Sequence, residues 1–432
     1  MYRLQKIILI CSLSVVSVAK AQPSSVSIFS PYTFYGIGVL ATDATIAQRA
    51  MGGVGVADYD SVRINPRNVA SYGRVARNTM LLDMGVAVMS CRQKCGNLRK
   101  VNNTVNLSNV SLVAPITKGV GLGLDIEPRS SVGYRVKFSS SRIDNSDIEQ
   151  FAEQDVTYEY SGQGGVTKWS LGAGFCSGRD RRLSLGAELI LLNCSITREG
   201  IARMSSLIEG KSDETTSVIK SETFVKLRVG VALQYDLFSL NGKRLTVGMQ
   251  FVPRANVKMS TETEIATSLD TLPNFTEIQR VRLPAEWRIG IGWHNRQVAL
   301  ESDCEWQRWK KSFVGEAVSA RIATENFFLW AVGVEFTPKF NDVRNYWNRV
   351  TYRVGFRYDN GYISDSGRRL RLRMVSLGIE MPMKQMSSCS LTLEYGRRGF
   401  ESDLIIKENF LNFKIGLSLY GTDGWFRKLK YK

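Results

Sequence analysis

The chain offers almost no histidine for catalysis that depends on this residue. The 432 residues include one histidine, His294, which stands beside Asn295 at an expected short turn. A Ser-His-Asp triad needs a histidine held between a nucleophile and a carboxylate, and no such set can be argued around His294. Asp303 and Glu305 are two acids on one face of an expected strand, but their position on that face does not by itself indicate catalysis. We therefore expect no enzymatic activity and no cofactor.

The cysteines indicate structural roles. Cys91 and Cys95 lie four residues apart in a polar stretch. A zinc site would need two further ligands of the same kind nearby, and none is there, so we expect no metal site. The spacing of Cys91 and Cys95 allows a small disulfide, because an exported chain folds in a compartment where disulfides form.

The segments that carry these residues alternate between apolar and polar side chains, with a period of two. Residues 352–358 alternate between Tyr, Val or Phe and Arg or Gly, and residues 225–235 and 411–420 alternate similarly. Such alternation predicts strands with one apolar and one polar face. A soluble β-sandwich alternates too, but the expected strands, roughly 10 to 14 residues long, exceed the usual length. These strands lie near residues 77–90, 104–115, 119–138, 167–176, 182–195, 222–237, 243–255, 284–294, 297–309, 324–337, 348–360, 370–382, 387–397 and 408–420.

The first eight connections between the expected strands alternate between long and short, and the pattern weakens later, where residues 338–347 make a longer turn. Long external loops and short periplasmic turns are typical of outer-membrane barrels. We therefore expect an all-β fold over residues 77–432, an antiparallel transmembrane β-barrel of about 14 strands. The long connections at 139–166, 196–221 and 256–283 should face the cell exterior, and the short ones at 177–181 and 238–242 should face the periplasm.

The polar face of these strands should line the barrel lumen. It carries both signs of charge on neighbouring strands, which cross-strand ion pairs would allow to coexist. We favour a ladder that stiffens the wall over a ligand site. The candidate lumen charges are Glu301, Asp303, Glu305, Arg353 and Arg357, with Arg135, Glu188, Lys226, Arg228, Glu286, Arg288, Glu335, Arg373, Glu380 and Glu394.

The first residues read as a targeting signal. Arg3 and Lys6 precede a short apolar run, and Ala19-Lys20-Ala21 fits a signal-peptidase site. We expect residues 1–21 to be removed, and a buried core segment is the alternative. The net charge of +17 should favour outer-membrane lipid and lipopolysaccharide phosphates, with an acidic partner as the alternative and no role for nucleic acid.

Residues 22–76 lack alternation and are rich in glycine and turn residues. Gly52 and Gly53 do not form a phosphate loop, because no Lys-Ser/Thr follows and no βαβ unit surrounds them. Asn65-Pro66 marks a turn. We expect residues 22–76 to form an N-terminal hatch that fills the lumen, with Gly52, Gly53, Asn65 and Pro66 allowing its compact packing.

The third expected strand is interrupted. Pro128 cannot donate a ladder hydrogen bond, and a glycine within a strand, here Gly133, often marks a bend. Together with Ser130 and Ser131 they predict a kink near residues 127–134, with a gap in the ladder as a candidate lateral gate. The alternative is a strand that ends near Glu127 and bends outside the membrane.

Several short stretches resemble the FadL/TodX-type outer-membrane transport family, in a form associated with the Bacteroidetes. They are Ser30-Pro31-Tyr32, Tyr35-Gly36-Ile37-Gly38, Arg49-Ala50-Met51-Gly52-Gly53, Ile64-Asn65-Pro66, Glu127 to Tyr134, Leu283-Pro284-Ala285, Trp306 to Trp309 and Trp425-Phe426-Arg427-Lys428. The resemblance covers essentially the whole chain after the signal peptide. The chain departs from the family where Asn-Pro-Ala becomes Asn65-Pro66-Arg67.

This resemblance implies a hatch-filled barrel in the Gram-negative outer membrane. It implies passive uptake of hydrophobic small molecules, with release through a kink in the third strand. Some members of the superfamily instead serve protein secretion or outer-membrane assembly, so an accessory barrel subunit of such a complex is the alternative. An uptake channel requires an apolar pocket, and a subunit requires an exposed interface.

Overall fold

The structure is a computed structural model. It describes all residues except 1–27, 78, 97, 143–153, 178–180, 206–213, 241, 269, 311, 313–321, 366, 384–386, 400–405 and 422–432. The expected signal peptide lies outside the described residues. No helix among the described residues is long and apolar enough to cross a membrane.

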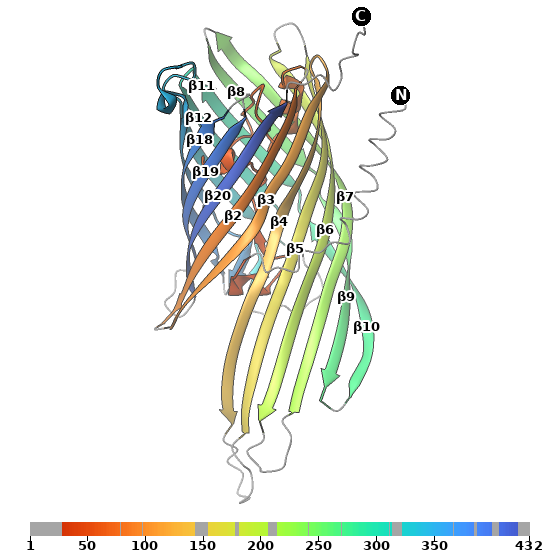
Figure 1. Cartoon of the computed structure of the whole chain (residues 1–432). Coiled ribbons are helices and arrows are strands. Elements are labelled where there is room, and N and C mark those ends of the chain that lie inside the picture. Colours follow the sequence, from red (N-terminus) through yellow and green to blue (C-terminus); the bar gives the residue numbers. More distant parts are fainter. Residues whose placement is uncertain are drawn as a thin grey trace, which may run out of the picture.

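The described residues form a closed antiparallel barrel of 14 wall strands (Figure 1), as the sequence predicts. Each wall strand pairs with its sequence neighbours, and the last pairs with the first from Met80↔Gly421 to Lys94↔Lys407. The strands are β2 (Met80–Cys95), β3 (Leu98–Thr117), β4 (Val120–Arg142), β5 (Gln154–Ser177), β6 (Leu183–Ser205), β7 (Glu214–Leu240), β8 (Lys243–Val252) with β9 (Ala255–Thr267), β10 (Thr271–Leu283) with β11 (Glu286–His294), β12 (Val298–Gln307), β14 (Phe327–Phe336), β15 (Thr351–Asp359), β18 (Arg371–Pro382), β19 (Ser388–Gly399) and β20 (Lys407–Gly421).

Two neighbouring wall strands are each broken at a proline. Pro253 separates β8 from β9, and Pro284 separates β10 from β11. Proline has no N–H to donate, so the ladder lapses beside it. Arg228 of β7 compensates, because its Nη2 donates to the carbonyl oxygens of Pro253 at 2.8 Å and Pro284 at 2.7 Å.

The wall has an apolar outer face and a polar inner face. On β12, the residues Leu300 and Cys304 are exposed, whereas Glu301, Asp303 and Glu305 are buried. Exposed apolar residues also follow one face of β7, with Arg228 buried on the other. This is the arrangement expected of a barrel in lipid.

The smaller elements lie before the wall or between its strands. Before it come η1 (Pro31–Phe34), β1 (Val39–Leu40), α2 (Ile46–Arg49) and η2 (Val69–Arg74). A turn η3 (Tyr346–Arg349) precedes β15, and a separate small sheet joins β13 (Ile322–Thr324), β16 (Ile363–Asp365) and β17 (Arg368–Arg369).

Residues 28–76, which we call the N-terminal segment, contact the inner face of the wall. The Gly52 N–H donates to Ser376 Oγ of β18 at 2.9 Å, and Asn68 Nδ2 donates to the Leu233 carbonyl of β7 at 3.2 Å. Thr392 of β19 donates to the Ile46 carbonyl at 3.1 Å. β7 lies across the barrel from the neighbouring strands β18 and β19, so the segment contacts opposite sides of the inner wall (Figure 1).

The expected long connections are mostly strand, which corrects the sequence interpretation. β4 pairs with β5 out to Arg142↔Gln154, β6 with β7 out to Met204↔Glu214, and β9 with β10 out to Ala266↔Thr271. Figure 1 shows these hairpins projecting far beyond the rest of the wall. We call this projection the extension; it comprises residues 132–142, 154–164, 196–205, 214–223, 257–267 and 271–281.

The faces of the extension are inverted relative to the wall. Its outer face is charged, with Arg135 Nε 2.7 Å from Glu159 Oε1 and Arg203 Nη1 3.9 Å from Glu159 Oε2. Its inner face carries a row of apolar residues with one glycine. The row crosses six strands, and each residue in it is the ladder partner of the next. The row consists of Val136, Tyr160, Gly200, Val218, Ile265 and Leu272.

The inversion explains two differences from the sequence interpretation. Strands that leave the lipid need no apolar outer face, so their alternation is not the one that marks a membrane strand. Arg135 was expected in the lumen but points outward, because the register shift between Pro128 and Ser130 exchanges the two faces of β4 beyond it.

A charged outer face cannot lie in lipid, so the extension should stand outside the membrane at the cell surface. We predict that a cysteine at Thr271 is labelled by an impermeant thiol reagent on intact cells. A cysteine at Lys243, beside the short β7–β8 turn at the opposite end, should be labelled only after the outer membrane is opened. The reverse pattern would contradict the orientation.

Candidate functional site

The site lies where the N-terminal segment meets the inner wall. Its glycines permit a close approach: Gly52 and Gly53 have φ of +78° and +85°, values that glycine adopts without strain. A side chain on Gly52 would meet the Phe356 carbonyl oxygen at 2.7 Å. These two residues therefore turn the segment directly against the wall.

Asn65 holds the turn that the sequence marked. Its Oδ1 accepts from Gln48 Nε2 at 2.8 Å, and its Nδ2 donates to the carbonyl oxygens of Gly55 at 2.7 Å and Asp58 at 2.6 Å. Pro66 is buried beside it. One amide thus joins three parts of the segment and fixes the direction in which Arg67 leaves the turn.

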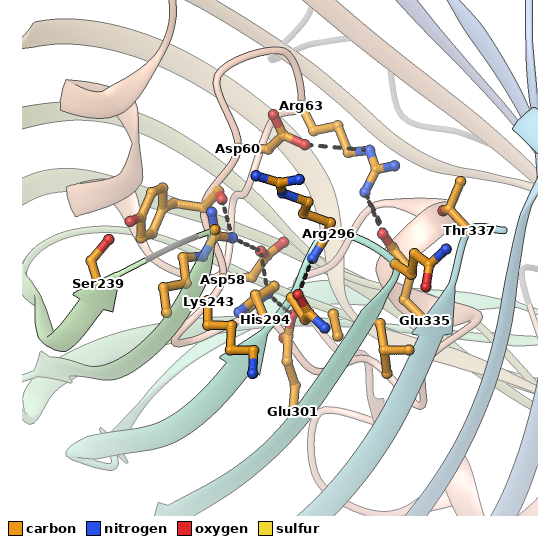
Figure 2. A pocket seen from close by; sticks show the side chains of 17 residues that line it. Asp58, Asp60, Arg63, Ser239, Lys243, His294, Arg296, Glu301, Glu335 and Thr337 are labelled. Atoms are coloured by element: carbon orange, nitrogen blue, oxygen red, sulfur yellow. Dashed lines mark hydrogen bonds and ion pairs between the residues drawn. The ribbon is translucent and has the colours of Figure 1, made fainter. Parts of the chain in front are cut away.

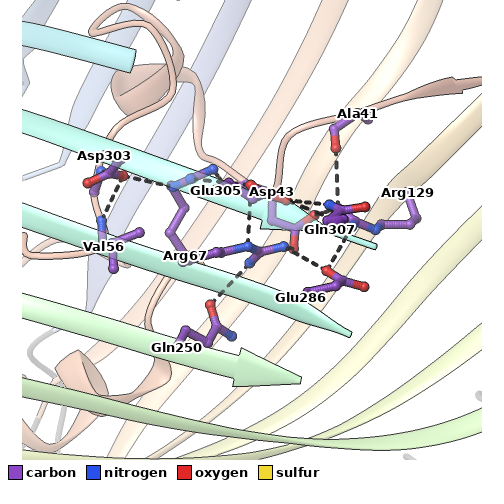
Figure 3. Close-up of polar contacts among 12 residues, drawn as sticks. Ala41, Asp43, Val56, Arg67, Arg129, Gln250, Glu286, Asp303, Glu305 and Gln307 are labelled. Carbon is purple, nitrogen blue, oxygen red and sulfur yellow. Dashed lines mark hydrogen bonds and ion pairs between the residues drawn. The ribbon is translucent and has the colours of Figure 1, made fainter. Parts of the chain in front are cut away.

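Arg67 lies at the centre of a buried ion cluster (Figure 3). Its side chain is 0% exposed, with Nε 3.3 Å from Asp303 Oδ2 and Nη2 3.7 Å from Glu305 Oε2. Asp303 Oδ2 also accepts from the Gly55 N–H at 2.8 Å and the Val56 N–H at 3.1 Å. The cation that replaces the family's small residue therefore pairs with two of the expected lumen acids.

Asp43 forms a second centre, also within the N-terminal segment. Its carboxylate lies 2.7 Å from Arg288 Nη2, 3.0 Å from Lys168 Nζ and 3.4 Å from Arg129 Nη1. Burial alone would raise the pKa of Asp43, but the charges of Arg288, Lys168 and Arg129 outweigh burial and hold that pKa well below its usual value. Asp43 is therefore ionised and neutralises several wall cations at once.

Glu286 and Glu305 complete the cluster from the wall. Glu286 lies 2.7 Å from Arg129 and 2.6 Å from Arg228, and Glu305 lies 3.4 Å from Arg288. The charges of β4, β5, β7, β11 and β12 are thereby joined through the segment. We call the following set the lumen cluster: Asp43, Arg67, Arg129, Lys168, Arg228, Glu286, Arg288, Asp303 and Glu305.

Several other expected lumen charges are also paired, whereas Lys226 is only half-buried. Arg373 is exposed on the outer face of β18, because alternation places it on the side of Val375 and Leu377, and this corrects the sequence interpretation. Arg353 contacts Glu335 at 2.8 Å and also contacts Glu380, and Arg357 lies 3.2 Å from Asp359. Glu301 lies 3.0 Å from His294. These pairs lie outside the lumen cluster, so the charges predicted on one polar face form several separate groups.

The expected gate residues lie where β4 parts from β3. Pairing of β3 with β4 runs from Thr117↔Val120 to Val110↔Ile126, whereas β4 stays paired with β5 out to Arg142. Beyond Ile126, β1 pairs with the freed edge, with Val39 opposite Ser131 and Leu40 opposite Ser130. A short strand of the N-terminal segment therefore lies along the edge that β3 leaves.

Further contacts tie the N-terminal segment to this edge. The Ala41 N–H donates to the Arg129 carbonyl at 2.9 Å, and the Ser30 N–H donates to the Gly133 carbonyl at 2.7 Å. Gly38 has φ +90°, and a side chain there would meet the Ser131 carbonyl oxygen at 2.2 Å. Pro128 lies at the register shift between β4 and β5. The edge from Pro128 to Gly133 is thus covered from inside.

The lumen on the extension side of the ion cluster is packed with apolar side chains. Ile37, Met51 and Val54 of the N-terminal segment pack there with Tyr362 and with inward residues of β4 to β14. Within the lumen cluster, the cavity between Asp43 and Glu286 measures only about 10 Å³. The arrangement therefore holds the segment in place by charge and by apolar contact.

The disulfide considered between Cys91 and Cys95 is not formed. Cys91 is a free, buried thiol in β2, and Cys95 lies in the same strand. Four residues of extended strand span about 13 Å, whereas disulfide-bonded Cα atoms lie within about 7 Å. The strand continues where the sequence interpretation placed a loop, and this keeps the two Cα atoms too far apart for a disulfide.

The sequence interpretation missed Asp43, Arg67, Arg129 and Lys168 as partners of the expected lumen acids. Asp43 and Arg67 lie in the segment without alternation, so no pattern assigned them a face. Arg129 lies within the expected kink. One available signal was the replacement of a small residue by Arg67, because a cation that enters a packed interior must find acids there.

The whole chain, residues 3–432, matches the family model described as BamG. Among solved structures, the chain is similar to the CymD monoaromatic hydrocarbon channel, with 14% identity, a TM-score of 0.56, and coverage of 90% of this chain and 100% of that one. A Pseudomonas aeruginosa FadL homologue has 14% identity, a TM-score of 0.58, and coverage of 88% and 99%.

The Ralstonia pickettii toluene transporter TbuX is similar to a comparable degree, with 14% identity, a TM-score of 0.52, and coverage of 89% and 99%. No curated protein sequence is significantly similar to the chain. The fold is therefore the one found in FadL-type channels, as the sequence resemblance implied.

Arg67→Ala should destabilise the barrel, because it leaves Asp303 and Glu305 buried beside a missing cation. Removing one partner of a buried ion pair costs about 3–5 kcal/mol. Urea unfolding followed by tryptophan fluorescence measures the change. Arg77→Ala removes an exposed cation and serves as the matched control. Arg67→Ala combined with Asp303→Asn should recover part of the loss, and equal stability of Arg67→Ala and Arg77→Ala would contradict the ion cluster.

Proposed function

The chain belongs to the BamG family, and we propose that it is a Gram-negative outer-membrane barrel that works with its lumen closed. In this proposal it is an accessory subunit of a protein secretion or outer-membrane assembly complex. Residues 1–21 direct export, residues 22–76 form the hatch, and outer-membrane lipid and lipopolysaccharide surround the barrel.

The lumen cluster is the observation that carries this proposal. Arg67 and Asp43 of the hatch are paired with acids and bases of the wall at 2.7 to 3.7 Å. Moving the hatch would leave several buried charges without partners, and each such charge is costly. A lumen closed in this way suits a structural role better than passage of a solute.

The extension has an exposed strand edge at which a partner protein could bind. Among the described residues, β10 pairs on one edge with β9, and on its other edge the Arg282 N–H donates a backbone hydrogen bond to the Ser312 carbonyl. Leu272, Phe275 and Ile278 on this strand are 49%, 52% and 65% exposed. A long edge strand with exposed apolar side chains offers a site for pairing with another chain. We infer that an extended segment of a partner adds to β10.

Uptake of hydrophobic small molecules is the second candidate. The similar solved structures are described as monoaromatic hydrocarbon channels and a toluene transporter. The separation of β3 from β4 and the apolar packing in the lumen also favour it, with Pro128, Ser130, Ser131 and Gly133 as the lateral gate. Uptake would require β1 to leave the β4 edge.

Depletion of the protein separates the two candidates. An accessory subunit predicts that the amounts of many other folded outer-membrane barrels fall together, while uptake of an aromatic hydrocarbon by the remaining cells is unchanged. An uptake channel predicts the opposite. Heat-dependent gel mobility of unrelated barrels and radiolabelled toluene uptake are the two measurements.

Two variants sharpen this experiment. Ala57 Cβ lies 3.4 Å from an ideal Cβ at Gly292, close to the spacing of a disulfide. Ala57→Cys with Gly292→Cys should therefore tie the hatch to β11 and still restore barrel levels, with Gly292→Cys alone as control. Ile278→Asp should fail to restore them and should lose the partner that the wild type retains. Failure of the locked variant, with recovery on reduction, would contradict a closed working state.

A further inference from the structure

A polar cavity opens at the short-turn end of the lumen (Figure 2). Its volume is about 370 Å³. The N-terminal segment contributes Asp58 and Arg63, the end of β11 contributes His294, and β12 contributes Glu301. This volume is free space beside the lining side chains and is large enough for water. An ion could therefore enter the cavity from solution.

Three donor atoms of different origin converge in this cavity. His294 Nε2 lies 3.2 Å from Asp58 Oδ1 and 3.0 Å from Glu301 Oε1. One ligand atom from each residue lies within 4.8 Å of the other two. In a tetrahedral zinc site with bonds of about 2.0–2.1 Å, ligand atoms lie about 3.3 Å apart. The three atoms are therefore near the spacing that zinc needs.

Asp58 is held in place independently of these contacts. Its carbonyl oxygen accepts from Asn65 Nδ2 at 2.6 Å and from Gln234 Nε2 at 2.8 Å. Arg244 Nη2 lies 3.5 Å from Asp58 Oδ1 and donates to the Tyr59 carbonyl at 2.7 Å. A carboxylate oriented by outer partners is typical of metal ligands. Asp58 is thus pre-positioned by groups that would not themselves bind the metal.

We propose that Asp58, His294 and Glu301 form a site for a divalent transition-metal ion, with Zn²⁺ the best fit. One imidazole and two carboxylates supply three ligands, and water from the cavity supplies the fourth. The ion would take the place of the proton that His294 shares with the two carboxylates, so binding releases a proton. Because Asp58 belongs to the N-terminal segment, the ion would fasten that segment to β11 and β12.

The sequence offered no sign of this site. Metal motifs are recognised by closely spaced ligands, whereas Asp58 lies more than 200 residues from His294 and Glu301. Only the return of the segment to the β11–β12 hairpin brings the donors together. The site does not depend on the proposed function, since either a closed subunit or an uptake channel could hold it.

Titration of the purified full-length protein in detergent tests the site. Calorimetry with Zn²⁺ should show one site, and Co²⁺ should give the visible absorption of a four-coordinate ion. Asp58→Asn, Glu301→Gln and His294→Ala should each weaken binding by at least about tenfold. Asp60→Asn removes an acid of the same cavity that is not in the donor set, and should bind like the wild type.

Two outcomes would overturn the proposal. One is wild-type protein that binds no Zn²⁺ beyond the His294→Ala level. The other is an equal loss in Asp60→Asn and Glu301→Gln, which would indicate general attraction by acids. Glu301→Gln changes the wall alone, so it gives the answer even where Asp58→Asn disturbs the packing of the segment.

Discussion

The structure depends on one electrostatic constraint: charges buried in the lumen must be neutralised there. β4, β5, β7, β11 and β12 place cations and acids on their inner faces, where each unpaired charge would be costly. Asp43 and Arg67 supply the missing partners from the N-terminal segment. The wall and the segment therefore stabilise each other, because Asp43 and Arg67 each pair locally with wall charges of opposite sign.

This pairing of buried charges distinguishes the chain from the open channel that its fold alone would suggest. Two solved structures with this fold are described as a monoaromatic hydrocarbon channel and a toluene transporter, but each shares only 14% identity with the chain. Here β1 covers the edge of β4 from which β3 has parted, and the ion cluster lies across the lumen. The proposed function accordingly assigns the partner contacts to the surface of the barrel, above all to the extension.

The strands could be predicted where lipid imposes a rule, and not elsewhere. The outward Leu300 and Cys304 and the inward Glu301, Asp303 and Glu305 follow directly from alternation. The extension was not predicted because its outer face has left the lipid and need not be apolar, and Arg135 was misplaced by one register shift at Pro128. The partners of the lumen charges were hidden for a different reason. Asp43 and Arg67 have no period, and only the path of the segment brings them to Arg288 and Asp303.

The conductance of the purified protein in planar lipid bilayers tests the central claim most directly. If the lumen cluster holds the N-terminal segment in place, the wild type should show no steady ion current. Asp43→Asn combined with Arg67→Ala, which removes both centres, should open large and long-lived conductance steps. A wild type that already conducts as freely as this variant would contradict the account.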